Sequence, residues 1–91
     1  MQALKAEIQG RVLALVETIL EQNSIAANVD PETRLADVGL TSMDMVNLML
    51  SVETEFDLKI PERDMTPTNF RSITRIAELV DTLSQAPAAT A

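Results

Sequence analysis

Apolar residues recur every three or four positions in three separate stretches of this 91-residue chain. The first stretch contains Leu4, Ile8, Val12, Leu15, Val16, Ile19 and Leu20. This period matches one face of an α-helix, and it predicts amphipathic helices over about residues 3 to 22, 42 to 56 and 73 to 83. No stretch shows the alternating pattern of a strand. The sequence therefore predicts an all-α fold, a bundle of three main helices plus one short helix.

The connection between the first two helices is long for a small domain. Apolar residues recur along it, so we expect it to be held against the core; they are Ile25, Val29, Leu35, Val38 and Leu40. Within it, a cap followed by proline predicts one helical turn at Asp30-Pro31-Glu32.

Proline and serine mark the later boundaries. Pro61 discourages continuation of the second helix, and a short helical turn is predicted at Pro61 to Met65. Ser72 is the expected cap of the last helix. We expect residues 1–83 to form a single domain and the proline-interrupted segment 84–91 to be a flexible tail.

Composition excludes several classes of function. The formal net charge is −7, which argues against binding of a nucleic-acid backbone. The absence of cysteine excludes disulfides and thiolate metal sites, and no stretch reaches the roughly 18 apolar residues of a membrane span. No export signal is visible at the N-terminus. We expect a cytoplasmic monomer without a membrane span, a nucleic-acid partner or a bound metal.

Independent catalysis lacks its usual residues. The chain has no histidine to act as a base for a serine nucleophile. Neither Lys5 nor Lys59 is placed by a motif, and Gly10 and Gly39 cannot form a phosphate-binding loop. We therefore predict no catalytic residue, and a function in binding, scaffolding or carrying.

The second predicted helix has two apolar stripes. The wider one, which we assign to the core, consists of Met45, Leu48, Met49, Val52 and Phe56. The narrower one consists of Met43, Val46 and Leu50 and lies beside Ser42. Because a surface helix needs only one apolar face, the second stripe indicates a partner, either the long loop of this fold or another protein.

Ser42 begins this helix and has two interpretations. Serine is a preferred N-cap, so Ser42 could have only a capping role. Alternatively Thr41 caps the helix, with Asp44 three residues later completing a capping box. Ser42 would then occupy the first helical position with a free hydroxyl, where the helix dipole and free N–H groups would favour a phosphodiester.

Acidic residues are concentrated around Ser42 in the sequence. Residues 30 to 64 contain three basic residues and nine carboxylates, namely Asp30, Glu32, Asp37, Asp44, Glu53, Glu55, Asp57, Glu62 and Asp64. This pattern predicts an acidic field that steers a basic partner toward Ser42. The alternative is that the charge only keeps the protein soluble.

The stretch "LADVGLTSMDMVNLMLSVETEFDLKIP" resembles the central motif of the acyl carrier protein superfamily, and the likeness covers about residues 4 to 83. The resemblance implies an acyl-carrier-like helical bundle. It also implies that a phosphopantetheinyl transferase attaches 4′-phosphopantetheine from coenzyme A to Ser42. The thiol of this arm would hold an acyl group as a thioester. The residues that this resemblance and the second stripe assign to partner docking are Thr41, Met43, Asp44, Val46, Asn47 and Leu50.

Departures from the motif bear on the cargo. The usual Asp-Ser-Leu reads Thr41-Ser42-Met43, and Asn47 and Thr54 stand where fatty-acid carriers often have glutamate. The chain is more similar to free-standing bacterial aminoacyl carrier proteins, which ligases resembling class II aminoacyl-tRNA synthetases load with an amino acid. That subtype implies such a ligase and a downstream acyltransferase as partners.

Three alternatives remain open from the sequence. The chain could be an acyl carrier for fatty-acid, lipid or polyketide synthesis. It could be an unmodified acidic helical adaptor in which Ser42 is only a cap. It could also be a subunit-interaction module that dimerises through the second stripe.

Overall fold

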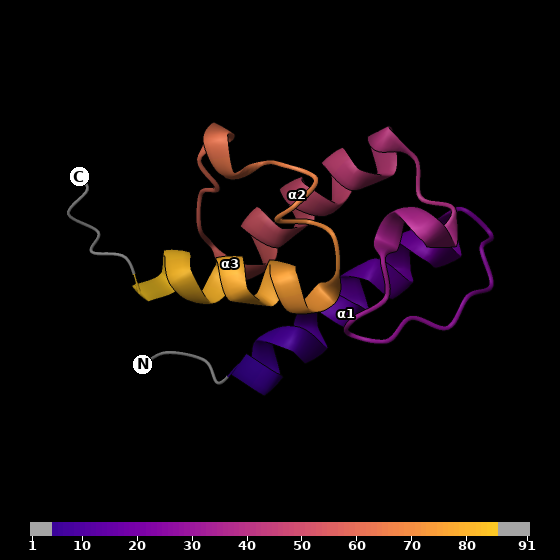
Figure 1. Ribbon diagram of the computed structural model, residues 1–91, viewed down its shortest axis with the longest axis horizontal. Helices are drawn as coiled ribbons and strands as arrows, with labels where there is room; N and C mark the ends of the chain where they lie inside the picture. Colours follow the sequence, from indigo (N-terminus) through magenta and orange to yellow (C-terminus); the bar gives the residue numbers. More distant parts are fainter. Residues whose placement is uncertain (1–4, 86–91) are drawn as a thin grey trace.

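The computed structural model describes residues 5–85, and these form three α-helices and two short 3₁₀ turns without a strand (Figure 1). The α-helices are α1 (Lys5–Gln22), α2 (Ser42–Phe56) and α3 (Ile73–Gln85). The short turns are η1 (Leu35–Val38) and η2 (Glu62–Asp64). The all-α prediction is confirmed, with α2 at its predicted bounds and α3 two residues longer than predicted. Of the predicted tail, residues 84 and 85 belong to α3, and residues 86–91 lie outside the described residues. The start predicted for the first helix, at about residue 3, also lies outside them.

One apolar core joins the three helices, because α1 packs against both α2 and α3. Several core side chains are 0% exposed, and they come from every helix: Val12, Val16, Leu48, Val52, Ile76 and Val80. Their spacing within each helix is the three-and-four pattern of the sequence. In the described part of the chain, no helix is long and apolar enough to cross a membrane.

The long connection between α1 and α2 is held against the core, as predicted. Leu35 and Leu40 are buried, and Ile25, Val29 and Val38 are partly buried and pack against the core. Backbone hydrogen bonds also tie the loop to the start of α3: Leu35 N–H donates to the Arg71 carbonyl at 2.9 Å, and Thr74 N–H to the Pro31 carbonyl at 3.0 Å. The segment before α2 is therefore fixed in place.

The turn predicted at Asp30-Pro31-Glu32 is present as a single hydrogen-bonded turn that does not continue into a helix. In it the Thr33 N–H donates to the Asp30 carbonyl at 3.0 Å, and the Asp30 N–H donates to Thr33 Oγ1 at 2.9 Å. The 3₁₀ turn η1, which the sequence did not predict, follows it and brings Leu35 into the core. Gly39 ends η1 with φ of 99°, a conformation that favours glycine, and turns the chain toward α2.

Polar contacts fix the C-terminal end of α2. Glu53 Oε2 accepts a hydrogen bond from the Ile60 N–H at 2.7 Å, which ties the following segment to the helix. Arg11 of α1 pairs with Glu55 at 2.9 Å, and its guanidinium lies 4.5 Å from the centre of the Phe56 ring. The contacts of Arg11 attach the far end of α2 to α1.

The remaining predicted turns are present. The short helix predicted at Pro61 to Met65 is the single 3₁₀ turn η2. Ser72 caps α3, because its Oγ accepts a hydrogen bond from the Arg75 N–H at 3.2 Å. The cap confirms the predicted start of the last helix.

Candidate functional site

Thr41, and not Ser42, caps α2. The Asp44 N–H donates to Thr41 Oγ1 at 3.2 Å, and the Thr41 N–H donates to Asp44 Oδ2 at 2.9 Å. These two bonds form the reciprocal capping box that the sequence allowed. The cap leaves Ser42 without a capping role and makes it the first residue of the helix.

Ser42 is exposed, and its hydroxyl has no hydrogen-bond partner among the described residues. The cap uses the Asp44 N–H, and the Met45 N–H donates to the Thr41 carbonyl. The N–H groups of Ser42 and Met43 have no partner within residues 5–85. A phosphate on Ser42 would therefore meet free donors at the positive end of a 15-residue helix.

A groove of about 650 Å³ begins at Ser42 and runs between α2, η1 and the segment before α3. Its apolar lining includes Leu40, Met45, Met49, Met65 and Phe70. Methionine side chains adapt easily to different shapes. A flexible group attached to Ser42 would have an open, partly apolar surface beside it.

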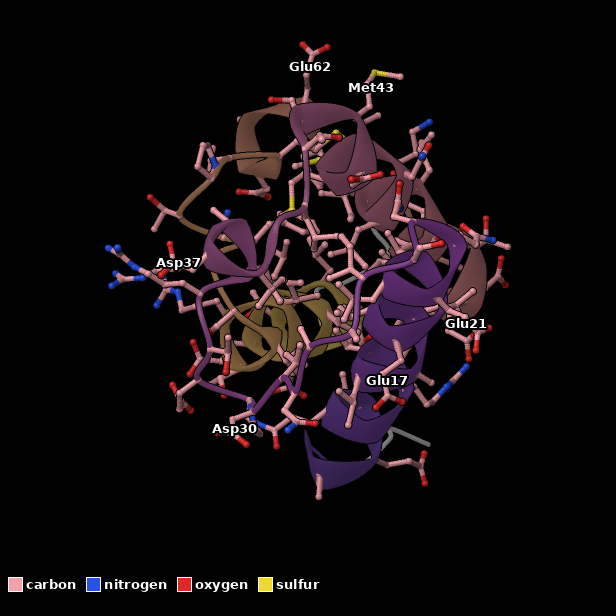
Figure 2. The ribbon with its side chains drawn as sticks, turned by 90° about the vertical axis from the view of Figure 1, so that its right-hand side faces the viewer. Glu17, Glu21, Asp30, Asp37, Met43 and Glu62 are labelled. Carbon is pink, nitrogen blue, oxygen red and sulfur yellow. The ribbon has the colours of Figure 1, made fainter. Side chains whose placement is uncertain are left out.

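The narrow stripe of α2 is exposed and is not covered by the long loop. Met43, Val46 and Leu50 are 69%, 45% and 52% exposed. Figure 2 shows Met43 pointing away from the body of the molecule. Thr41 and Asn47 are also exposed. The structure thus excludes the interpretation in which the stripe packs under the loop, and leaves it available to another protein.

Asp44 does not belong to this exposed surface, although the sequence assigned it to partner docking. It is 8% exposed, and its Oδ1 accepts a hydrogen bond from Asn23 Nδ2 at 3.1 Å. Thr41 Oγ1 donates to Asp44 Oδ2 at 3.0 Å in addition to the Thr41 N–H. These bonds, above all that from the Thr41 backbone, hold the pKa of Asp44 below its usual value even though burial opposes this. The carboxylate is charged but turned inward, so we assign it to the cap.

The lining of the groove at Ser42 does not carry the acidic charge that the sequence predicted around this residue. The charged residues that line the groove with Ser42 are Arg34, Asp37 and Arg71, two basic and one acidic. A second groove, of about 450 Å³, lies on the other side of Leu50 between α1 and α2. The charged residue in its lining is Glu55, which is paired with Arg11. The net charge of the chain is thus not concentrated in the two grooves that flank α2.

Asn23, Arg34 and Arg71 were not predicted to belong to the site. Asn23 follows α1 and lies 21 residues before Asp44, and no local pattern links the two. The arginines reach the groove from η1's start and from the segment before α3. Only the tertiary fold brings them together. No group of three or more histidine, cysteine or acidic residues in the described chain could hold a metal ion.

Comparison with known proteins gives consistent matches. Residues 10–83 match the family described as "Phosphopantetheine attachment site". The chain is 53% identical over 85 residues to Aminoacyl carrier protein 1 of Bradyrhizobium diazoefficiens, covering 93% of this chain and 94% of that one. It is 52% identical over 73 residues to Aminoacyl carrier protein 2 of the same organism, covering 80% and 82%.

The fold is similar to that of a chain in a solved structure. That structure is the crystal structure of Bradyrhizobium japonicum glycine:[carrier protein] ligase complexed with glycylated carrier protein. The match has a TM-score of 0.69 and 54% identity, and it covers 79% of this chain and 97% of that chain.

Proposed function

Because the chain belongs to the phosphopantetheine attachment family of carrier proteins, we propose that Ser42 is its attachment residue and that its cargo is an amino acid. The family establishes the class of function. The chain is a carrier and not an enzyme, it bears 4′-phosphopantetheine, and a separate enzyme loads it. The attached group supplies the thiol that this cysteine-free chain lacks, so that cargo is held as an activated thioester.

The single observation that carries the choice of Ser42 is its free hydroxyl at the first position of α2, next to the groove. During attachment, Ser42 Oγ would form the new bond to phosphorus, and the bond to the nucleotide of coenzyme A would break. The hydroxyl proton would pass to a base of the transferase, because this chain has no histidine. Thr41 and Asp44 would hold the hydroxyl in place by fixing the start of the helix.

The amino-acid cargo is supported by the two relatives, both named aminoacyl carrier proteins, and by the complex of a similar chain with a glycine ligase. We propose that a ligase of this kind loads the chain and that an acyltransferase later removes the cargo. The exposed stripe of Met43, Val46 and Leu50, with Thr41 and Asn47, is the proposed docking surface for these enzymes. We place the protein in the cytoplasm.

Attachment is tested by intact-mass spectrometry after incubation with coenzyme A and a phosphopantetheinyl transferase. The wild-type mass should rise by one phosphopantetheine, and Ser42→Ala should abolish the rise. Ser51→Ala is the matched control, because Ser51 lies on the same helix and is half-buried; it should be modified like the wild type. Modification of Ser42→Ala, or none of the wild type with several transferases, would contradict the proposal.

The cargo is tested on the phosphopantetheine-bearing protein with ATP, an amino acid and the glycine ligase. A gain of one amino-acid residue that hydroxylamine removes supports the thioester. If fatty-acid enzymes load the chain efficiently and the ligase does not, the chain is an acyl carrier of the fatty-acid type.

A further inference from the structure

We infer that the loading ligase contacts the face around Ser42 through an uncharged, apolar surface and not through a basic patch. This inference rests on the proposed function, because it concerns the enzyme that loads the arm on Ser42. It also runs against the net charge of −7, which on its own would favour a basic partner. Three features of the described residues lead to it.

The first feature is the composition of the exposed surface. Every exposed residue from position 41 to position 50 is uncharged: Thr41, Ser42, Met43, Val46, Asn47 and Leu50. Three of these six are large apolar side chains. The contact surface that α2 offers in its first three turns therefore resembles the apolar centre of a protein interface.

The second feature is that Asp44, the sole carboxylate between positions 41 and 50, is buried and hydrogen-bonded within the protein. Its two oxygens accept three hydrogen bonds, two from Thr41 and one from Asn23. Asn23 also donates from the same amide nitrogen to the Ile19 carbonyl at 2.8 Å, at the end of α1. The two N–H groups of the Asn23 side chain therefore link the end of α1 to the start of α2. Because the carboxylate is 8% exposed and already accepts three hydrogen bonds, it offers little to an incoming arginine or lysine.

The third feature is the charge beside the stripe. On the groove side, the guanidinium groups of Arg34 and Arg71 form no ion pair with another described residue, and Asp37 is the acidic residue that lines the same groove. On the α1 side, Glu55 is neutralised by Arg11 at 2.9 Å. The lining of neither groove therefore carries an excess of negative charge for a basic partner, and the lining of the groove at Ser42 would repel one.

Acidic side chains elsewhere do not change this picture. Glu17, Glu21 and Asp30 lie away from Met43 in Figure 2. Glu62 is close to Met43 in that projection, but Figure 1 separates η2 from the first turn of α2 along the long axis of the molecule. The acidic surface thus acts at longer range, where salt screens it over about 10 Å at ordinary ionic strength.

The experiment measures kcat/KM for loading of the phosphopantetheine-bearing protein by the glycine ligase at low and high NaCl concentration. Because the contact is apolar, kcat/KM should change by less than about threefold between about 0.05 M and about 0.5 M NaCl. A fall of more than about tenfold would show a charged contact and overturn the inference.

Charge variants make the same test by a second route. Asn47→Glu places a carboxylate in the exposed surface, and Thr82→Glu places the same charge on an exposed position of α3. Asn47→Glu should lower kcat/KM at least about fivefold, since a buried unpaired charge weakens an interface, whereas Thr82→Glu should have no effect. The double variant Arg34→Glu/Arg71→Glu should load no faster than the wild type.

The opposite results would overturn the inference. A basic patch on the ligase predicts that Asn47→Glu and Arg34→Glu/Arg71→Glu are loaded faster than the wild type. Loading with such charge dependence would leave the proposed function intact and remove only this inference. No loading of the wild-type protein by the glycine ligase would instead reject that ligase as the partner, and the inference with it.

Discussion

The two apolar faces of α2 are built from similar residues but have opposite environments. Leu48 and Val52 are 0% exposed, whereas Met43 and Leu50 on the other face are 69% and 52% exposed. The difference arises because α1 packs against one side of α2, while Leu35 and Leu40 anchor the long loop in the core and leave the narrow stripe of α2 uncovered. Residue type alone therefore does not separate stabilising side chains from docking side chains. The tertiary packing does.

The largest expected effect is the difference in stability when a leucine is truncated to alanine on one face of α2 and then on the other. Leu48→Ala should lower the free energy of unfolding by about 2 to 5 kcal/mol, because it removes buried contacts and leaves a cavity. Leu50→Ala should change it by less than about 0.5 kcal/mol. Urea unfolding followed by circular dichroism measures both.

For loading by the ligase, we expect the opposite order, with Leu50→Ala having the larger effect. Leu50→Ala should lower ligase kcat/KM several-fold, whereas Leu48→Ala should load normally under conditions in which it is folded. Equal destabilisation by the two substitutions would mean that the faces are not different in the way the structure shows.

A smaller effect is expected at the cap that presents Ser42. Thr41→Val keeps the shape of the side chain but removes the hydroxyl that accepts from the Asp44 N–H and donates to Asp44 Oδ2. It should cost about 1 kcal/mol of stability. Ser42→Ala, whose hydroxyl has no partner among the described residues, should leave thermal stability nearly unchanged. If Ser42→Ala were the more destabilising change, Ser42 would be the true cap.

The smallest effect concerns pH and Asp44. Its pKa is lowered in the folded protein, chiefly by the hydrogen bond from the Thr41 backbone, so the carboxylate contributes stability above its unfolded pKa of about 4. That contribution is lost as the pH falls through the lower folded pKa. The difference in free energy of unfolding between the wild type and Asp44→Asn should therefore shrink as the pH is lowered from about 5 to about 3. Urea unfolding across this range measures it, and a difference independent of pH would contradict the assignment.

Local patterns predicted the helices well. Both ends of α2 were correct because a capping box marks its start and the approach to Pro61 marks its end. The second stripe was also visible from its spacing. The sequence did not show whether the long loop covers this stripe, because that depends on where Leu35 and Leu40 are anchored in three dimensions.

Charge and long-range contacts were predicted less well. Counting carboxylates along residues 30 to 64 suggested an acidic surface at Ser42, but the fold turns Asp44 inward and brings Arg34 and Arg71 to the groove. The bond between Asn23 and Asp44 joins the two ends of the loop and has no sequence signature. The turn at Asp30 was predicted, but the 3₁₀ turn η1 that follows it was not.

The central claim is that Ser42 carries phosphopantetheine loaded with an amino acid. The most direct measurement is mass spectrometry of the protein purified from its native cell, with the modified peptide sequenced. We predict that the peptide containing Ser42 carries phosphopantetheine bearing a small amino acid that hydroxylamine releases. An unmodified Ser42, or an arm bearing a fatty acyl chain, would contradict the claim.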